Sequence, residues 1–402
     1  MNNKKLYIIN QHYYPELAST AQVFQEIAEY FVTVGYDVTV IAGIPFYHDN
    51  ISAEHYKLNG LNGVKIKRLW NTVFNKSSFM GKGLNLLTFQ VSLLFYTLFR
   101  IKKYSIVMAG TNPPLAVVSA ALAKIFKRFK LVSVVQDLYP DILISSGYAN
   151  EDALPYKLLS KVMKRSFRRC DSVVTISHDM GMHISRTYEI DHVDIINNMV
   201  IGEIFPMRNN ELKAREGLSD KLVVMYSGNF GVAHEYETLF NTVMLLKNNV
   251  DIVFRIVGGG INYNLFKEAC ASENFSNITF LPYVDKEELN ENLNLADIHI
   301  IIFNDNFKNV LMPSKYYGIL ASGKPFIIIA DGENDISRDI GSDHMGFVIR
   351  RGDSTGLLRI LLDIAENKDK LLEMSEKAIR LYNEKYSRDL VFEKYRQLLK
   401  EL

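Results

Sequence analysis

Residues 6–42 read LYIINQHYYPELASTAQVFQEIAEYFVTVGYDVTVIA, and this stretch decides the fold class. An apolar run at residues 6–9 predicts a strand. Apolar residues at positions 24, 27, 28 and 31 then share one face of a helix, for which Ser19 and Thr20 are good N-cap residues. Residues 37–42 predict the next strand. Strand, helix and strand in this order form a βαβ unit, so the sequence predicts a parallel sheet.

The same alternation of strands and helices continues along the chain and divides into two series. The first ends with a strand at residues 172–177, and the second begins with a strand at residues 222–226. We therefore predict an α/β fold of two doubly wound, Rossmann-like domains with a boundary near residues 198–220. Ligands bind at the carboxyl ends of the strands in such sheets, and a cleft between two of them suits a two-substrate reaction.

Composition excludes several classes of protein. The 402 residues include 46 Lys and Arg against 45 Asp and Glu, so the chain is not a general nucleic-acid binder. Two cysteines provide neither a disulfide framework nor a four-cysteine zinc site, which indicates a cytosolic protein. We expect no signal peptide and no membrane-spanning helix, because no apolar stretch reaches about 20 residues.

The strand predicted at residues 222–226 runs into SGNFG at residues 227–231, and a helix follows. Glycines at this point let the backbone approach a ligand closely, and the N–H groups of the next helix can bind an anion. His234 stands at the start of that helix. A tight turn without a ligand is the alternative, and it is the favoured interpretation of the three glycines at residues 258–260.

Two cationic side chains of the second domain could meet a phosphate. MPSK at residues 312–315 opens a helix, and Lys315 in its first turn opposes the helix macrodipole. A facing phosphate explains that lysine, whereas a solvated side chain is the alternative. Arg255 interrupts an otherwise apolar strand and is the second candidate, with an ion pair inside the fold as its alternative.

The first domain offers polar residues at two predicted strand ends. HYYPE at residues 12–16 follows the first strand, and QDLYPD at residues 136–141 follows another. Carboxylates at adjacent strand ends can converge on one hydroxyl, although Glu16 could be a helix cap and Asp137 a turn residue. The chain has no P-loop, nucleophile elbow or paired-histidine motif, and no Asp-x-Asp pair for a metal–nucleotide complex. Cations and backbone N–H groups would therefore meet any phosphate charge.

Taken in order, these motifs resemble the glycosyltransferases of family 4, which have the two-domain GT-B fold. Within that family the chain is most similar to the WbuB-like fucosamine transferases of O-antigen synthesis. The resemblance extends from QHYYPELAST at residues 11–20 through VVQDLYPD, YSGNFGVAHE and FRIVGGG to MPSKYYGILASGKP at residues 312–325. It implies an acceptor-binding, membrane-facing domain at 1–200, a nucleotide-sugar domain at 201–385, and a last helix at 386–402 that returns to the first domain.

The resemblance also implies the reaction. A sugar, such as an N-acetylated amino or deoxy sugar, would pass from a UDP-sugar to a saccharide on undecaprenyl diphosphate, with retention and without a metal or cofactor. The predicted donor-binding residues are Gly228, Asn229, Gly231, His234, Arg255, Tyr283, Val284, Ser314 and Lys315. The predicted acceptor-binding residues are His12, Tyr14, Glu16 and Asp137. Of all these, Asp137, Glu16 and Lys315 are the catalytic candidates.

Three departures from the family pattern bear on the site. The family's E-x7-E pair of glutamates, which contacts the donor sugar and the ribose, falls on Val310 and Gly318, so Lys315 is the candidate to compensate. His234 falls where many relatives carry a lysine. The histidine common in the first domain of relatives falls near Gln136, which makes Asp137 its replacement candidate.

A predicted helix of the first domain carries a basic face, which could bind a membrane surface. Its cations are Lys157, Lys161, Lys164, Arg165, Arg168 and Arg169. Residues 84–99 form an apolar helix with a narrow polar stripe, typical of a helix that is buried or lies in a bilayer interface. We therefore expect a cytoplasmic protein bound peripherally to anionic lipid of the inner membrane leaflet. A solvated basic face beside a core helix is the alternative.

Two other functions fit the same fold. A nucleotide-sugar 2-epimerase would need acidic residues around the donor sugar, and the missing glutamate pair argues mildly against it. A non-catalytic scaffold fits the missing pair but not the intact GNFG and PSK motifs.

Overall fold

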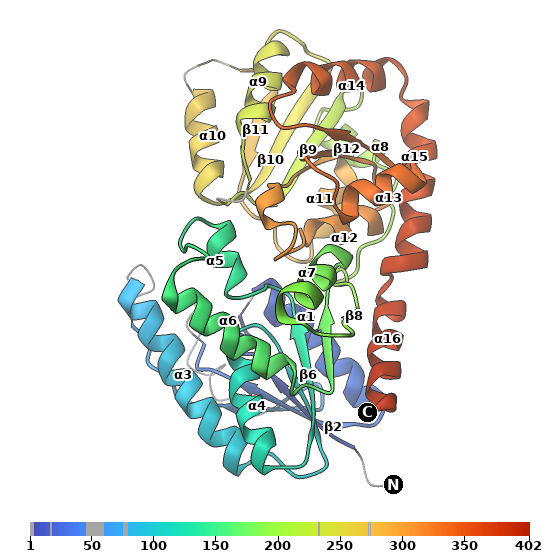
Figure 1. Cartoon of the computed structure of the whole chain (residues 1–402). Helices are drawn as coiled ribbons and strands as arrows, with labels where there is room; N and C mark the ends of the chain where they lie inside the picture. The colour runs from blue at the N-terminus through green and yellow to red at the C-terminus, as the bar shows by residue number, and fades with distance from the viewer. Residues whose placement is uncertain are drawn as a thin grey trace. The chain divides into compact units, whose positions relative to one another are not determined.

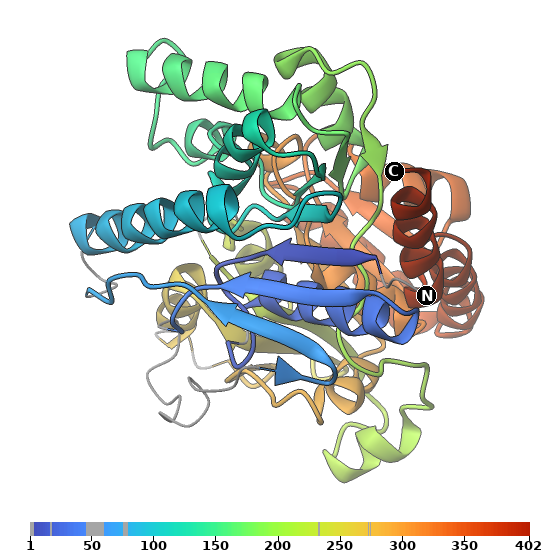
Figure 2. The ribbon, with the colours of Figure 1, turned by 90° about the horizontal axis from the view of Figure 1, so that it is seen from below.

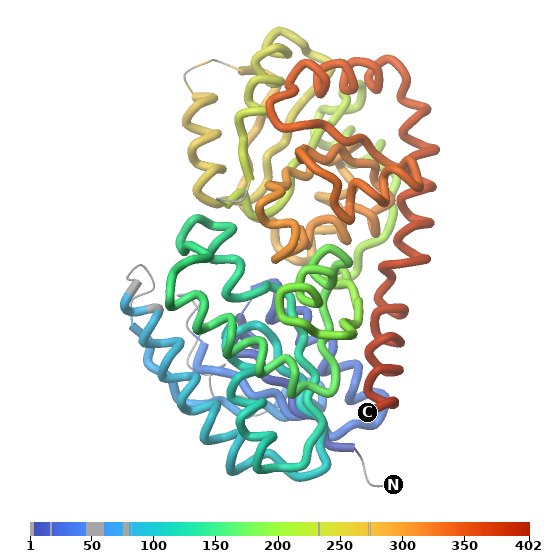
Figure 3. Tube along the Cα trace, viewed as in Figure 1, coloured from blue at the N-terminus to red at the C-terminus, as the bar shows by residue number. Residues whose placement is uncertain are grey.

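The computed structural model describes residues 4–16, 18–45, 60–74, 79–231, 234–271, 273 and 275–402 (Figure 1). The chain divides into two compact units, each built on a mainly parallel sheet. The first unit holds Met1–Asn197, Asn309–Met312 and Val391–Leu402, and the second holds Asn198–Lys308 and Pro313–Leu390. Figure 3 traces the chain through these segments from blue to red. The predicted α/β fold with two parallel sheets is confirmed.

The first sheet has the strand order β3-β4-β2-β1-β5-β6-β7-β8 and is parallel except between β3 and β4. Figure 2 shows the blue strands of this sheet lying side by side. The strands are β1 (Lys5–Ile9), β2 (Asp37–Ala42), β3 (Gly60–Leu61), β4 (Val64–Arg68), β5 (Ile106–Ala109), β6 (Lys130–Val135), β7 (Ser172–Thr175) and β8 (Asp194–Ile195). The helices include α1 (Ser19–Thr33), α3 (Phe79–Phe99), α4 (Ala116–Phe126), α5 (Asp141–Ser145), α6 (Leu154–Phe167) and α7 (His178–Tyr188).

The predicted βαβ unit is confirmed as β1, α1 and β2. Strand β1 pairs with β2 from Lys5–Asp37 to Ile9–Ile41. The predicted apolar face of α1 is buried, because Phe24 and Phe31 expose none of their surface. The predicted N-caps are wrong, since the helix begins at Ser19 itself and no side chain caps it.

The last helix, α16 (Arg388–Glu401), joins the first unit through Val391–Leu402. The rings of Tyr30 in α1 and Phe392 in α16 stack at 4.3 Å between centroids with an interplanar angle of 4°. Val391 and Tyr395 are buried on the same helix. The expected return of the C-terminal helix to the first domain is confirmed, because these apolar residues need a partner surface that α1 provides.

The second sheet is parallel throughout, in the order β11-β10-β9-β12-β13-β14. Its strands are β9 (Leu222–Asn229), β10 (Ile252–Gly259), β11 (Ile278–Leu281), β12 (Ile298–Ile302), β13 (Phe326–Ile329) and β14 (Gly346–Ile349). The helices are α8 (Asn210–Arg215), α9 (Glu237–Leu245), α10 (Ile261–Ala271), α11 (Leu289–Leu295), α12 (Lys315–Ala321), α13 (Asp335–Asp343), α14 (Ser354–Glu366) and α15 (Asp369–Leu381). A 3-10 turn at Asp305–Phe307 and a π-helical turn at Tyr382–Tyr386 complete this unit.

Buried strands form the core of the second unit. Strand β12 (IHIII) is buried along its whole length, and β9 and β13 contribute Val224 and Ile327 to the same apolar cluster. Helices lie on both faces of the sheet in Figure 1, which explains why these strands read as continuous apolar runs. The sheet thus holds the carboxyl ends of its strands at one edge.

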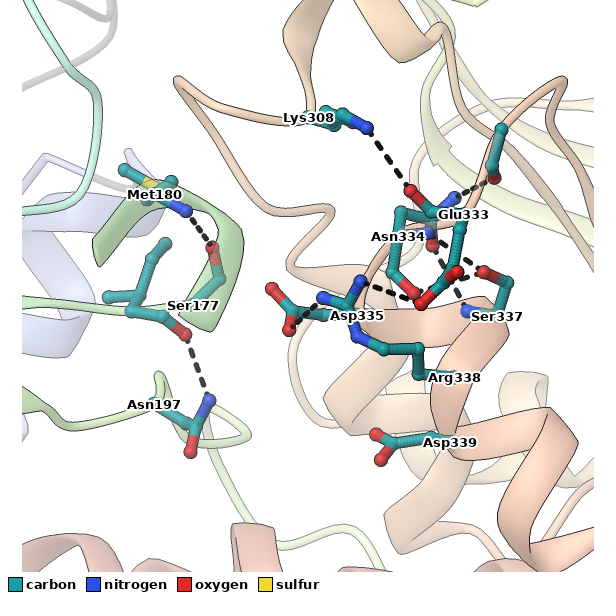
Figure 4. A network of polar contacts seen from close by, with 12 residues as sticks. Ser177, Met180, Asn197, Lys308, Glu333, Asn334, Asp335, Ser337, Arg338 and Asp339 are labelled. Atoms are coloured by element: carbon teal, nitrogen blue, oxygen red, sulfur yellow. Dashed lines mark hydrogen bonds and ion pairs between the residues drawn. The ribbon is translucent and has the colours of Figure 1, made fainter. Parts of the chain in front are cut away.

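Side-chain caps fix helices that the sequence analysis did not single out. In α13 the Asn334 side chain accepts from Ser337 N at 3.0 Å, and the Ser337 hydroxyl accepts from Asn334 N at 2.8 Å (Figure 4). In the first unit, the Ser177 hydroxyl accepts from Met180 N at the start of α7. Such caps satisfy backbone N–H groups that a helix start leaves unpaired.

Candidate functional site

The carboxyl ends of β9 and β10 form the first part of the candidate site. The predicted strand at residues 222–226 extends to Asn229, and Gly228 pairs with Gly258 of the adjacent strand. Gly258 has φ +133°, and a Cβ there would lie 2.2 Å from the carbonyl oxygen of Gly228. Two strands approach this closely only because the residue is glycine. Within the triple glycine, Gly258 is therefore required for the close packing of the two strands and not only for a turn.

The turn after β9 is held by the turn after β10. The Phe230 N–H donates to the Gly259 carbonyl at 2.7 Å, and the Phe230 carbonyl accepts from Asn262 N at 3.0 Å. Tyr283 lies beside this turn with its hydroxyl 3.4 Å from Asn229 Oδ1 and 3.3 Å from the Gly259 carbonyl. The predicted donor residues Gly228, Asn229 and Gly231 therefore share one small region of backbone at the strand ends.

Lys315 brings a cation to this region. Its Nζ lies 3.5 Å from the centroid of the Tyr226 ring and is buried, with no hydrogen-bond partner among the described residues. A Cβ placed on Gly228 would lie 3.5 Å from Lys315 Cε, so the side chain passes directly over the glycine turn. Burial lowers the pKa of Lys315 well below its usual range, because a buried ammonium loses its hydration. An anion at this position would supply the missing partner.

His234 lies close to the same cation but is neutral. Burial, together with the neighbouring charge of Lys315, lowers its pKa to about 3. Its Nδ1 has no hydrogen-bond partner in the part of the chain described, and its ring meets Phe230 edge-on at 6.1 Å. His234 can therefore offer a hydrogen bond to a ligand, whereas the positive charge comes from Lys315.

The other predicted donor residues have contacts that point less directly to a bound donor. Ser314 is exposed and precedes α12 without a side-chain cap bond. Arg255 forms an ion pair with Glu216 at 3.0 Å, which is the alternative that the sequence left open. Val284 and Arg255 line the same pocket of about 290 Å³, together with Asn292, whose amide lies 3.3 Å from Ser227 Oγ. A donor contact for Arg255 stays a prediction.

The two glutamate positions of the family pattern hold no charge. Val310 is buried, and its carbonyl accepts from Leu138 N at 2.9 Å. A Cβ on Gly318 would meet Leu293 Cδ1 at 3.4 Å, so a side chain as long as glutamate would have to displace packed apolar groups. Neither Val310 nor Gly318 can therefore supply the carboxylate that the family pattern has at its position.

The predicted acceptor residues of the first unit lie at the ends of β1 and β6. His12 Nδ1 and Glu16 Oε2 are 2.7 Å apart, and Glu16 is buried. The carbonyl of Tyr14 accepts from the guanidinium of Arg68 at 2.5 Å. The imidazole and the carboxylate thus orient each other, and the His12 ring remains partly exposed to a ligand.

The loop after β5 connects these residues to Asp137. The Gln11 N–H donates to the Asn112 carbonyl at 2.6 Å, and the Asp137 N–H lies 3.3 Å from Thr111 Oγ1. Strand β5 lies between β1 and β6, so the three loops follow one another along the same sheet edge. Burial raises the pKa of Asp137 to about 6. The predicted convergence of carboxylates at neighbouring strand ends is consistent with this order.

A buried network close to Asp137 was not singled out from the sequence. The Asp141 carboxylate accepts from the Tyr188 hydroxyl and lies 2.8 Å from His183 Nε2, which ties α5 to α7. Burial, and then proximity to Asp141, raise the pKa of Tyr188. The only sequence signal is the second aspartate of QDLYPD, because its partners lie more than 40 residues away. This network fixes the segment that carries Asp137.

The six cations predicted to bind membrane lie on or just after α6. Lys164 and Arg168 both pair with Glu189 at 2.6 Å, and Lys157 pairs with Asp152 at 2.9 Å. Lys161, Arg165 and Arg169 have no acidic partner among the described residues. No helix in the described part of the chain is both long and apolar enough to cross a membrane.

Comparisons with known proteins agree with this architecture. The family model described as Glycosyltransferase Family 4 matches residues 20–201. The chain is 24% identical over 298 residues to the Pseudomonas aeruginosa protein named glycosyltransferase WbjE, covering 73% of this chain and 74% of that one. It is 24% identical over 351 residues to Escherichia coli K12 WcaI, named as a colanic acid biosynthesis glycosyl transferase, covering 83% and 85%.

Two solved structures have the same fold over nearly the whole chain. Sucrose-phosphate synthase from Thermosynechococcus elongatus has a TM-score of 0.75 at 13% identity, covering 99% of both chains. Anabaena Alr3699/HepE in complex with UDP and glucose has a TM-score of 0.72 at 13% identity, covering 100% of both. The chain is therefore a glycosyltransferase with the GT-B fold. The family to which its residues 20–201 correspond is Glycosyltransferase Family 4; the WbuB-like branch stays a prediction.

Proposed function

We propose that the protein transfers a sugar from a UDP-sugar to a lipid-linked saccharide during assembly of O-antigen or capsular polysaccharide. The observation that carries the donor half is the buried, unpartnered ammonium of Lys315 above the glycine turn of β9. A nucleotide diphosphate supplies the negative charge that this ammonium lacks. The name of WcaI and the complex of HepE with UDP and glucose support the polysaccharide context and the UDP donor.

The diphosphate would contact Lys315 and the backbone at Gly228 and Gly231. The His234 ring, which is neutral, would add a hydrogen bond. With one ammonium and backbone N–H groups to balance the leaving diphosphate, the transfer needs no metal. Retention at the anomeric carbon is part of the same proposal and rests on the family resemblance.

The acceptor hydroxyl would bind in the first unit, at the sheet edge that carries His12, Glu16 and Asp137. The His12–Glu16 pair at 2.7 Å can accept a hydroxyl proton through the imidazole. Asp137, whose pKa of about 6 leaves it ionised at neutral pH, can hold that hydroxyl or stabilise positive charge on the sugar.

Membrane association is supported by helix α3, which buries a stripe of polar residues and exposes a stripe of apolar ones. In α3 the polar residues face inward: Asn85 is 1% exposed and bonds to Phe74 and Thr72, and Ser92 Oγ donates to the Trp70 carbonyl at 2.7 Å. The apolar residues of its other face are exposed, in an i, i+3, i+7, i+11 and i+15 series: Leu84, Leu87, Val91, Phe95 and Phe99. An exposed apolar stripe of this kind indicates an interaction surface.

Neighbouring helices extend this surface and add charge. Helix α4 packs against α3 and exposes Ile125 and Phe126, and α6 packs against α4 and exposes Leu158. The three helices lie side by side in Figures 1 and 2. The free cations Lys161 and Arg165 lie on α6. Apolar groups next to cations match an anionic bilayer surface, which is where a lipid-linked acceptor resides.

Liposome flotation tests the membrane part. We expect binding to vesicles that contain phosphatidylglycerol, and a loss of about tenfold or more for the Phe95→Ser/Phe99→Ser double variant. Leu265→Ser on α10, which also removes an exposed apolar side chain, is the matched control and should bind normally. Absence of binding at low salt, or equal binding by the double variant, would reject this surface.

Incubation with a panel of UDP-sugars and an undecaprenyl-diphosphate-linked saccharide tests the reaction. A labelled sugar on the lipid supports transfer, including transfer of an N-acetylated amino or deoxy sugar. A changed free UDP-sugar without lipid product supports the 2-epimerase alternative. Neither product in the presence of measurable UDP binding supports a scaffold.

A further inference from the structure

A second basic pocket lies in the second unit at the edge opposite the donor site. Its volume is about 520 Å³, and its wall includes Asp297 and Lys324. Asp297 directly precedes β12, and Lys324 stands two residues before β13, so both mark the amino ends of their strands. In a parallel sheet this edge is separated from the carboxyl ends by the strand length, roughly 15 Å for five residues.

Lys324 is the unusual group in this pocket. It is 8% exposed and lines the pocket. Burial lowers its pKa to about 8, partly offset by the charge of Asp297. At pH 7 roughly nine in ten molecules still carry the proton. The pocket therefore holds a largely buried positive charge, which is costly unless a nearby negative charge compensates it.

The one carboxylate of the pocket compensates Lys324 only in part, because it is hydrogen-bonded to other groups. Asp297 Oδ2 accepts from Lys213 Nζ at 2.8 Å and from Val223 N at 2.7 Å, and Oδ1 accepts from Asn209 Nδ2 at 2.8 Å. Its charge is thus balanced by Lys213. The remaining charges are positive, because Arg208 and Lys368 also line the pocket.

We propose that this pocket binds a phosphorylated small molecule whose phosphate contacts the Lys324 ammonium. Lys324, Arg208 and Lys368 bring several cations to one concave site. Such a site suits a ligand with several negative charges, such as a phosphate, better than a ligand with a single carboxylate. Hydroxyls of Ser219 and Ser375 line the same wall and can donate to phosphate oxygens. The volume exceeds that of inorganic phosphate and leaves room for an organic part against Leu371. This site is additional to the proposed donor site.

Residue-resolved amine labelling tests the proposal. Reductive methylation modifies the free amine, and peptide mass spectrometry reports its rate separately at Lys324, Lys315 and the exposed Lys267. We expect pyrophosphate to slow labelling of Lys324 by about tenfold at saturation, because an adjacent anion raises its pKa and covers it. Labelling of Lys267, which is exposed on α10, should not change.

Two controls separate this site from other causes. In Arg208→Gln, an exposed position, protection of Lys324 should need about tenfold more pyrophosphate, while protection of Lys315 is unchanged. Glucose 6-phosphate in place of pyrophosphate shows whether an organic phosphate fits. Protection of Lys324 by sodium chloride at equal ionic strength, no protection by either phosphate, or equal protection in Arg208→Gln would overturn the proposal.

Discussion

The Lys315 ammonium lies 3.5 Å from the centroid of the Tyr226 ring, and no acidic side chain or other hydrogen-bond acceptor meets it in the described residues. A cation over an aromatic face is stabilised by about 0.5–2 kcal/mol, which is less than the cost of burying a charge. The arrangement therefore leaves the cation poised for a stronger partner. Tyr226 is itself fixed, since its hydroxyl donates to the Asn229 carbonyl at 2.8 Å.

Lys315→Met should weaken UDP binding by about 10- to 100-fold, the range expected for a charge-assisted hydrogen bond. Isothermal titration calorimetry measures the dissociation constant. Lys267→Met removes an exposed lysine of the same unit and should bind UDP as the unchanged protein does. An unaltered dissociation constant in Lys315→Met would remove this lysine from the donor site.

Binding of UDP should be coupled to uptake of a proton by Lys315 at pH values above the pKa of this lysine in the free protein. Burial holds the pKa of Lys315 low in the free protein, and a bound diphosphate raises it because an opposite charge favours the ammonium. Affinity should therefore fall as the pH rises above the free-protein pKa. Titrations in two buffers of different ionisation enthalpy give the number of protons bound, and a value of zero at every pH would contradict this mechanism.

Gly258→Ala should destabilise the second unit by about 2–3 kcal/mol, since its φ of +133° and its Cβ both conflict with the structure. Urea unfolding followed by fluorescence measures the change. Gly341→Ala in α13 is the control, because a Cβ there meets nothing within 4 Å. If the two variants are equally stable, β9 and β10 are not as close at Gly228 as the structure has them.

Stability should fall between pH 6.5 and pH 4 because of His299. It is fully buried in β12, where desolvation lowers its pKa to about 4. Below about pH 6.5 this histidine binds a proton in the unfolded chain but not in the folded chain. The free energy of unfolding therefore decreases as the pH falls through this window. Between pH 7 and pH 5, His299→Gln should remove about 2 kcal/mol of the stability loss. A loss equal to that of the unchanged protein would contradict a buried neutral histidine.

The succession of strands and helices along the chain and the positions of the donor motifs could be predicted because they depend on local patterns. Apolar runs mark the strands, and glycines after β9 and β10 mark their ends. The orientation of α3 could not be predicted in this way. Its polar stripe at Asn85, Thr88 and Ser92 is visible in the sequence, but its inward direction depends on bonds to residues 70–74.

Long-range pairing limited the site prediction in the same way. Arg255 is an isolated cation in a strand, and only the fold reveals that Glu216, 39 residues earlier, neutralises it. The pairing of Lys315 with Tyr226 also joins distant segments. Residue type and local position therefore predicted which groups could act, whereas their partners depended on the tertiary structure.

Asp137 should give the transfer reaction an acidic limb near pH 6. Burial raises its pKa to about 6, so the carboxylate that we propose to act on the acceptor side becomes protonated below that pH. Asp137→Asn should lower kcat by about 100-fold or more, and the remaining activity should lose its dependence on pH around 6.

Asp137→Glu keeps the charge but moves it by one methylene, and it should retain the acidic limb at reduced rate. Donor affinity serves as the internal control, because we propose that UDP binds to the second unit, where neither variant changes a residue. If Asp137→Asn shows the same acidic limb as the unchanged protein, another group is responsible and Asp137 has only a structural role. The neighbouring network would then be the first place to look, since Asp141 is buried against His183 and Tyr188.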